Sequence, residues 1–304
     1  MSNGCSYCGT ANVEGADRCV ACGTPLTTQI AAVTAGLPPP LETVPPMIAA
    51  EAVPAKPPLN GWSATLIFLA YFLTQTIVGF IAGFIAVMLT MVRNPGVDAK
   101  EMLPETLQEI VAVAALPTMV MSGLVMFVLA LYRIRPQLRD CSPTGAAWVV
   151  GTFRQNLAGL VMGGVTAIAY FLLSTLFPPA EDLVHGPLSQ MALKPGAQQI
   201  IWITVALLFA PLIEECLFRG ILYGGYRRAM GPTGAALLTT FIFWALHLPE
   251  TARFWPAMVG IAALAIVALW NRLKFSAIGP AVAVHIGYNG MMVLAAIIVS
   301  IARQ

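Results

Sequence analysis

Residues 201–220 read IWITVALLFAPLIEECLFRG and place two adjacent carboxylates, Glu214 and Glu215, at the end of an apolar run. Arg219 follows four residues after Glu215, in a chain of which only 10% of the residues are charged. A carboxylate at membrane depth costs several kcal/mol unless it is paired or hydrated, so such residues are usually retained for function. This glutamate pair is therefore the first candidate for chemistry.

The composition indicates a membrane protein with several spans. The chain has 304 residues, and 58% of them are hydrophobic, which is more than a soluble domain needs. The formal net charge is +2, and no basic stripe occurs outside short loops. Nucleic acid is therefore not expected as a partner.

A cysteine motif of a different kind occupies the N-terminus. Cys5 and Cys8 form one Cys-x-x-Cys pair, Cys19 and Cys22 form a second, and a glycine follows each pair. This spacing brings four thiolates within tetrahedral reach of one Zn²⁺, and glycine allows the tight turn around sulfur. No His or carboxylate is placed to leave an open coordination position. We therefore expect a structural zinc ribbon at 1–24 that folds only with its metal.

Residues 25–60 are rich in proline and alanine, including Pro38-Pro39-Pro40. Such a segment buries too little surface to order itself, and we expect a disordered linker. Because this linker separates the ribbon from the rest of the chain, we expect the ribbon to dock a cytosolic protein partner.

The remaining residues, 61–304, predict an all-α, polytopic transmembrane bundle. A span needs about 20 apolar residues. Apolar segments lie at 62–92, 108–133, 156–177, 198–218, 233–248, 254–271 and 277–301. We expect seven spans, of which the fifth is short, or eight if the last segment breaks at Pro280.

Lys and Arg near the ends of these segments predict the orientation. A cytoplasmic N-terminus places nine of them inside, namely Arg133, Arg135, Arg139, Arg154, Arg219, Arg227, Arg228, Arg272 and Lys274. Five lie outside, namely Arg93, Lys100, Lys194, Arg253 and Arg303. This orientation also keeps the ribbon's thiols in a reducing compartment. We expect a multi-pass protein of a bacterial plasma membrane with a cytoplasmic N-terminus.

Two histidines also lie within apolar segments. His247 ends the sequence FWALH, and His285 lies four residues before Asn289, on the same helix face. If the segments before and after Gly231 form an antiparallel hairpin, Glu214 and His247 differ in height by about 3 Å. We therefore expect four polar side chains from three segments to converge in an apolar interior.

The two glutamates are expected to differ in role. Glu215 and Arg219 have the i, i+4 spacing of a helical ion pair. Glu214 is rotated by about 100° from its neighbour and is not held in that geometry. We assign Glu215 to structural support with Arg219 and leave Glu214 free to act as a base.

These motifs resemble the signatures of the CPBP intramembrane proteases, a family that includes CAAX proteases and bacteriocin-processing enzymes and is also called the ABI family. The family's three signatures are EExxxR, FxxxH and HxxxN. They are met in order by Glu214-Glu215-x-x-x-Arg219, Phe243-x-x-x-His247 and His285-x-x-x-Asn289. The resemblance covers residues 60–301 and includes neither the ribbon nor the linker.

The resemblance implies an intramembrane endopeptidase that hydrolyses a peptide bond of a membrane-associated protein or peptide, such as a prenylated CAAX C-terminus. It implies that Glu214 and His247 activate a water molecule, while His285 and Asn289 stabilise the oxyanion. A base for the nucleophile and donors for the developing charge are what acyl transfer requires. We expect the cavity to open toward the cytoplasmic leaflet.

Other readings of the same residues stay open. Two histidines and a glutamate also suit a catalytic Zn²⁺ with an open position. Asparagine suits an oxyanion donor better than a zinc ligand, which favours the metal-free route. A catalytically silent membrane scaffold or immunity protein would use the two glutamates and Arg219 only as a buried ion-pair network. A transporter is disfavoured because no inverted repeat is visible.

Overall fold

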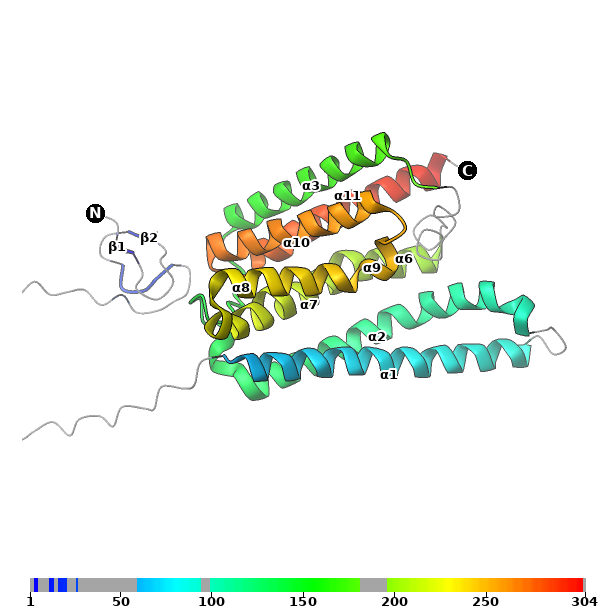
Figure 1. Cartoon of the computed structure of the whole chain (residues 1–304), viewed down its shortest axis with the longest axis horizontal. Helices are drawn as coiled ribbons and strands as arrows, with labels where there is room; N and C mark the ends of the chain where they lie inside the picture. The colour runs from blue at the N-terminus through cyan, green and yellow to red at the C-terminus, as the bar shows by residue number, and fades with distance from the viewer. Residues whose placement is uncertain are drawn as a thin grey trace, which may run out of the picture.

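The computed structural model describes residues 3–4, 11–13, 16–20, 26, 59–93, 99–180 and 196–302. Most of these residues form long helices that run alongside one another (Figure 1). The helices are α1 (Gly61–Arg93), α2 (Ala99–Leu138), α3 (Phe153–Leu176), α6 (Ala197–Thr204), α7 (Ala210–Glu215), α8 (Tyr223–Leu246), α9 (Leu248–Thr251), α10 (Trp255–Phe275) and α11 (Gly279–Ala302). Two π-helical segments, η1 (Val205–Phe209) and η2 (Cys216–Leu222), flank α7. The predicted helical bundle is confirmed.

Six of the described helical stretches are long and apolar enough to cross a membrane. One of them, Gln199–Leu246, has 48 residues, more than twice the roughly 20 that one crossing needs. It is broken at Gly231, whose φ of 72° favours glycine, with Pro232 directly after it. Beyond the break the chain folds back. The contact between Phe218 and Phe243 shows this, since their rings meet edge to face with centres 5.2 Å apart.

The described helices therefore provide seven crossing segments. The fifth, residues 232–246, is short, as expected from the sequence. The alternative with eight spans required a break at Pro280, but Pro280 lies in the first turn of α11, which continues as a single helix to Ala302. That break is absent from the described residues 279–302.

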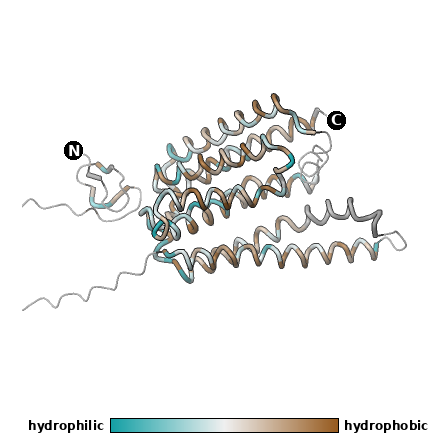
Figure 2. The backbone as a smooth tube through the Cα atoms, in the orientation of Figure 1, coloured by the Kyte–Doolittle hydropathy of each residue, from teal (hydrophilic) through white to brown (hydrophobic). Residues whose placement is uncertain are grey.

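The outer surface of the bundle suits lipid rather than water. Large apolar side chains point outward along the helices, including Phe80 (75% exposed), Leu73, Val161 and Leu172. Figure 2 shows hydrophobic residues along the length of the helices, while hydrophilic residues gather near the helix ends. Apolar surface on this scale is a liability in water and is stable in a bilayer. The chain is an integral, multi-pass membrane protein.

The two ends of the bundle differ. We call the end with Gly61 and Gly231 the N-proximal end and the end with Ala197 and Ala302 the C-proximal end (Figure 1). At the N-proximal end, the connection between α2 and α3 packs into the bundle. Its Ala147 and Val149 carbonyl oxygens accept hydrogen bonds from the N–H groups of Ile278 and Gly279 at 2.9 and 3.1 Å. The connection thereby joins the start of α11 to the end of α2.

Two arginines that the charge count placed in loops at this end are in fact buried. Arg219 is 2% exposed and Arg272 is 1% exposed. Arg272 donates through Nη2 to the carbonyl oxygen of Gly145 at 3.0 Å and so holds the α2–α3 connection. Without these two interior residues, the count from the sequence becomes seven basic residues against five, so the predicted asymmetry is smaller but keeps its sign.

The N-terminal ribbon is only partly described. Cys5, Cys8 and Cys22 lie outside the described residues, whereas Cys19 is described and buried. The strands β1 (Asn3–Gly4) and β2 (Ala11–Asn12) pair antiparallel. The N–H group of Val20 donates to Asn12 Oδ1 at 2.8 Å. The zinc ribbon and the disordered linker remain predictions.

Candidate active site

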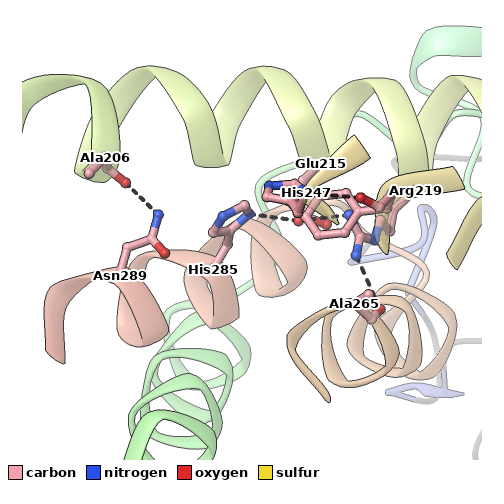
Figure 3. Close-up of polar contacts among 8 residues, drawn as sticks. Ala206, Glu215, Arg219, His247, Ala265, His285 and Asn289 are labelled. Carbon is pink, nitrogen blue, oxygen red and sulfur yellow. Dashed lines mark hydrogen bonds and ion pairs between the residues drawn. The ribbon is translucent and has the colours of Figure 1, made fainter. Parts of the chain in front are cut away.

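The glutamate pair lies in α7, directly after the π-helical segment η1. The N–H group of Ala210 donates to the carbonyl oxygen of Val205, five residues back, instead of to Ala206. The next residue in the π register is Pro211, which has no N–H group to offer. The carbonyl oxygen of Ala206 accepts instead from Nδ2 of Asn289 in α11, at 2.8 Å (Figure 3). The irregular turn thus ties the glutamate helix to α11, and such turns are frequent at functional sites.

A buried set of charges lies behind Glu214. Oε1 of Glu215 is 3.1 Å from Nη1 of Arg219 and 2.9 Å from Nδ1 of His285, and the Glu215 side chain is fully buried (Figure 3). Arg219 also donates through Nη2 to the carbonyl oxygen of Ala265 at 3.2 Å. Its guanidinium lies 4.1 Å from the centre of the Phe243 ring. The structure contains the expected pair between Glu215 and Arg219 and adds His285 to it.

Hydrogen bonds fix the tautomers of both histidines. Nδ1 of His247 lies 2.8 Å from the carbonyl oxygen of Phe243, which can only accept, so Nδ1 carries the proton. Nδ1 of His285 faces Glu215, which is a carboxylate because it also pairs with Arg219. In their neutral forms both rings therefore leave the Nε2 lone pair free. For His285 to donate from Nε2, its ring must be the imidazolium.

Four of the predicted residues share one cavity. Glu214, His247, His285 and Asn289 all line a pocket of about 400 Å³. Oε2 of Glu214 is buried and has no hydrogen-bond partner among the described residues. Arg219 and Glu215 lie outside this lining and support it from behind. The structure therefore brings the candidate base, both imidazoles and the amide to one space, as the sequence predicted.

One residue of the lining was not among the predicted site residues. Tyr288 lines the pocket beside Asn289, and its ring centre lies 6.3 Å from that of Tyr170. No motif marks Tyr170, which comes from α3, more than a hundred residues from the second histidine motif. Only the packing of α3 against α11 reveals that these two rings form part of the wall.

The pocket lies on one side of the glutamate pair. Its lining runs from Glu214 and His285 to Trp202, Thr251 and Ala257, which lie near the C-proximal ends of their segments. On the other side, every residue from 215 to 225 is buried. The lining therefore lies on the C-proximal side of the glutamates. The expectation that the cavity opens toward the cytoplasmic leaflet stays a prediction.

A catalytic zinc bound by Glu214, His247 and His285 stays an untested alternative. Within the described part of the chain, no group of three or more His, Cys, Asp and Glu side chains could hold a metal ion. Glu215, the second carboxylate, is engaged with Arg219 and His285. We therefore derive no step through a catalytic zinc.

These features define a polytopic membrane protein with a polar pocket inside its helical bundle. Residues 196–291 match the family model for Rce1-like proteins, described as type II CAAX prenyl endopeptidase Rce1-like. The matched range contains all three motifs. This similarity agrees with the resemblance of the three motifs to the CPBP family of CAAX proteases. Comparison with curated proteins and with solved structures gave no match.

Proposed function

We propose that this protein is an intramembrane endopeptidase that hydrolyses a peptide bond of a membrane-associated protein or peptide. The observation that carries the proposal is the pocket in which Glu214, His247, His285 and Asn289 meet inside an apolar bundle. The similarity of residues 196–291 to a family described as type II CAAX prenyl endopeptidases supports the same reaction. Substrates of the CAAX type are the first class to examine.

Glu214 is the proposed general base. Its free Oε2 accepts a proton from a water molecule, and the Nε2 lone pair of His247 orients that water by accepting a hydrogen bond from its other O–H. The resulting hydroxide attacks the peptide carbonyl carbon. When the C–N bond breaks, the proton held by Glu214 passes to the leaving amine, so that the carboxylate is regenerated. A buried carboxylate oxygen without a partner is suited to this task, because nothing competes for the water.

His285 and Asn289 are the proposed donors to the oxyanion. Asn289 donates one N–H to the carbonyl oxygen of Ala206. This bond fixes the amide plane and leaves the second N–H for the substrate. His285 donates from Nε2 as an imidazolium, and Glu215 stabilises that charged form through Nδ1. Donors held in place before the reaction stabilise developing charge at low reorganisation cost.

The test is the isosteric change Glu214→Gln. Loss of the base should lower kcat by about 10²- to 10⁴-fold. The measurement is cleavage of fluorogenic peptides, with and without a prenyl group, by purified protein in lipid nanodiscs. Asp140→Asn is the matched control, because it changes a carboxylate to an amide outside the pocket, where Oδ1 accepts a hydrogen bond from Ser142 N–H. Unchanged turnover in a folded Glu214→Gln protein would rule out the proposed base.

A further inference from the structure

Two tyrosine rings form one wall of the pocket. Tyr288 comes from α11 and Tyr170 from α3, and both line the cavity together with a third aromatic residue, Trp202 of α6. Tyr288 is only 4% exposed and packs in a buried apolar cluster with Leu264 and Ala167. The proposed chemistry uses none of these rings, so their part in the pocket needs another explanation.

The wall is held from behind by the contact between α3 and α11. A Cβ on Gly163 would collide with the carbonyl oxygen of Val284, and one on Gly287 would collide with the carbonyl oxygen of Leu160. Backbone therefore meets backbone on both helices, and α3 has no room to move toward α11. Tyr170 is fixed beside the Tyr288 ring by this packing.

Gly260 of α10 leaves the space that the Tyr288 side chain occupies. A Cβ on Gly260 would lie 2.5 Å from Oη of Tyr288 and 2.9 Å from Cδ2 of Tyr170. Both distances are far shorter than the roughly 3.5–4.0 Å of an ordinary carbon contact. Because α3 and α11 are fixed against each other, a side chain at this position would push the Tyr288 ring toward the cavity, which is the open side.

The aromatic wall lies next to the proposed oxyanion donors. Tyr288 follows His285 by three residues and directly precedes Asn289, and all three line the pocket. His285 and Tyr288 are therefore about 4.5 Å apart along the axis of α11. Successive residues of an extended peptide are about 3.3–3.6 Å apart. A peptide whose scissile carbonyl lies at His285 and Asn289 thus brings a neighbouring side chain to the Tyr288 ring.

We propose that Tyr170 and Tyr288 form the subsite for a substrate side chain next to the scissile bond, and that Gly260 sets the width of this subsite. The inference rests on the proposed endopeptidase function. The two ring centres are 6.3 Å apart, and aromatic rings pack on one another at about this spacing. An aromatic side chain therefore fits the wall best, and alanine leaves it without a contact.

The test uses the full chain in lipid nanodiscs and peptides that carry Ala, Leu or Phe on either side of the cleaved bond. Wild-type protein should prefer Phe to Ala by about tenfold or more in kcat/KM. Gly260→Ala, which displaces Tyr288 into the cavity, should lower this ratio by about tenfold. Adding Tyr288→Phe removes the colliding oxygen, so the double variant should recover most of the preference.

Gly164→Ala is the matched control, because a Cβ there meets only Cγ of Met291, at 3.9 Å. It should keep the wild-type ratio. Tyr170→Leu removes one ring without adding bulk, and it should lower the preference for Phe over Leu. This variant decides the matter by itself if Gly260→Ala does not fold.

Glu214-dependent cleavage with an unchanged ratio of Phe to Ala in Gly260→Ala, or an equal loss for every peptide, overturns the subsite and leaves the endopeptidase intact. If Glu214→Gln cleaves as the wild type does, the proposed base fails instead, and the side-chain ratios still decide the subsite.

Discussion

At the residue scale, Glu215 explains how two charged groups and a histidine coexist inside an apolar bundle. Its carboxylate is shared between Arg219 and His285, so the cationic arginine is not left uncompensated. Removing one partner of a buried ion pair costs about 3–5 kcal/mol, because the other charge is left behind. We therefore predict that loss of Glu215 or Arg219 lowers the stability of the fold, whereas Glu214 differs from them because its Oε2 has no hydrogen-bond partner among the described residues.

Asn289 links stability to the proposed chemistry, and its substitution tests that link. Asn289→Asp replaces the amide NH2 group, and with it both N–H donors, by one oxygen, and it places a negative charge beside the Ala206 carbonyl. We predict a loss of about 10²- to 10³-fold in kcat, the range for a missing oxyanion donor. Asn289→Gln keeps the donors but displaces them, and it should retain more activity than Asn289→Asp. Equal activity of wild type and Asn289→Asp would contradict the assigned role.

The sequence could not have revealed the contact between Glu215 and His285. The i, i+4 spacing of Glu215 and Arg219 signals their pairing, because both lie on one helix face. His285 follows 70 residues after Glu215, and only the packing of α11 against α7 brings them together. The motif order placed both histidines near the glutamates, but it did not show which carboxylate each would face.

At the element scale, hydropathy was enough to find the crossing segments. Each predicted apolar stretch corresponds to a helix or to one limb of the hairpin at Gly231, because the bilayer demands long apolar helices with internally satisfied backbones. The π-helical segments on either side of α7 were not predicted. They depend on a competition between α- and π-type hydrogen bonds that is decided by Pro211, Asn289 and Trp148 together.

Pro211 is predicted to set the register of the glutamate helix. Pro211→Ala supplies an N–H group that can bond within the helix to the carbonyl oxygen of Ala206 and displace Asn289. We expect a melting temperature equal to or above that of wild type, because proline is unfavourable inside a helix, and at least a roughly tenfold loss of kcat as the donor is displaced.

Pro136→Ala is the matched control for this substitution. Pro136 is exposed near the end of α2, far in sequence from the glutamate helix. Thermal unfolding and kcat are measured for both variants. If Pro211→Ala keeps wild-type kcat, the irregular turn has no part in positioning the site.

At the scale of the whole molecule, the two ends of the bundle differ in how tightly they are packed. The N-proximal end is closed by the α2–α3 connection, and Arg272 fastens that connection through Gly145. The pocket lining lies on the C-proximal side of the glutamates, beside the short fifth segment. The sequence predicted that this segment is short, yet it did not show that the N-proximal end is tightly packed. The charge count misjudged that end by treating Arg219 and Arg272 as loop residues.

The zinc ribbon is predicted to be dispensable for peptide hydrolysis. Purified full-length protein should contain a single zinc bound by the four N-terminal thiolates, and a chelator should remove it. Turnover of an unselective peptide should stay unchanged after chelation and in protein lacking residues 1–58. Zinc content by mass spectrometry and kcat are measured on the same samples. Loss of turnover in the folded shortened protein would contradict a separate docking role for the ribbon.

The central claim is that groups from separate segments act on one water molecule. The most direct test compares kcat of Glu214→Gln, His247→Gln and the double variant, all checked for folding by thermal unfolding. Residues that act as a unit are non-additive, so each single change should cost about 10²- to 10⁴-fold and the double little more than the worse single change. Losses that multiply in the double variant, or a single variant with wild-type kcat, would contradict the account.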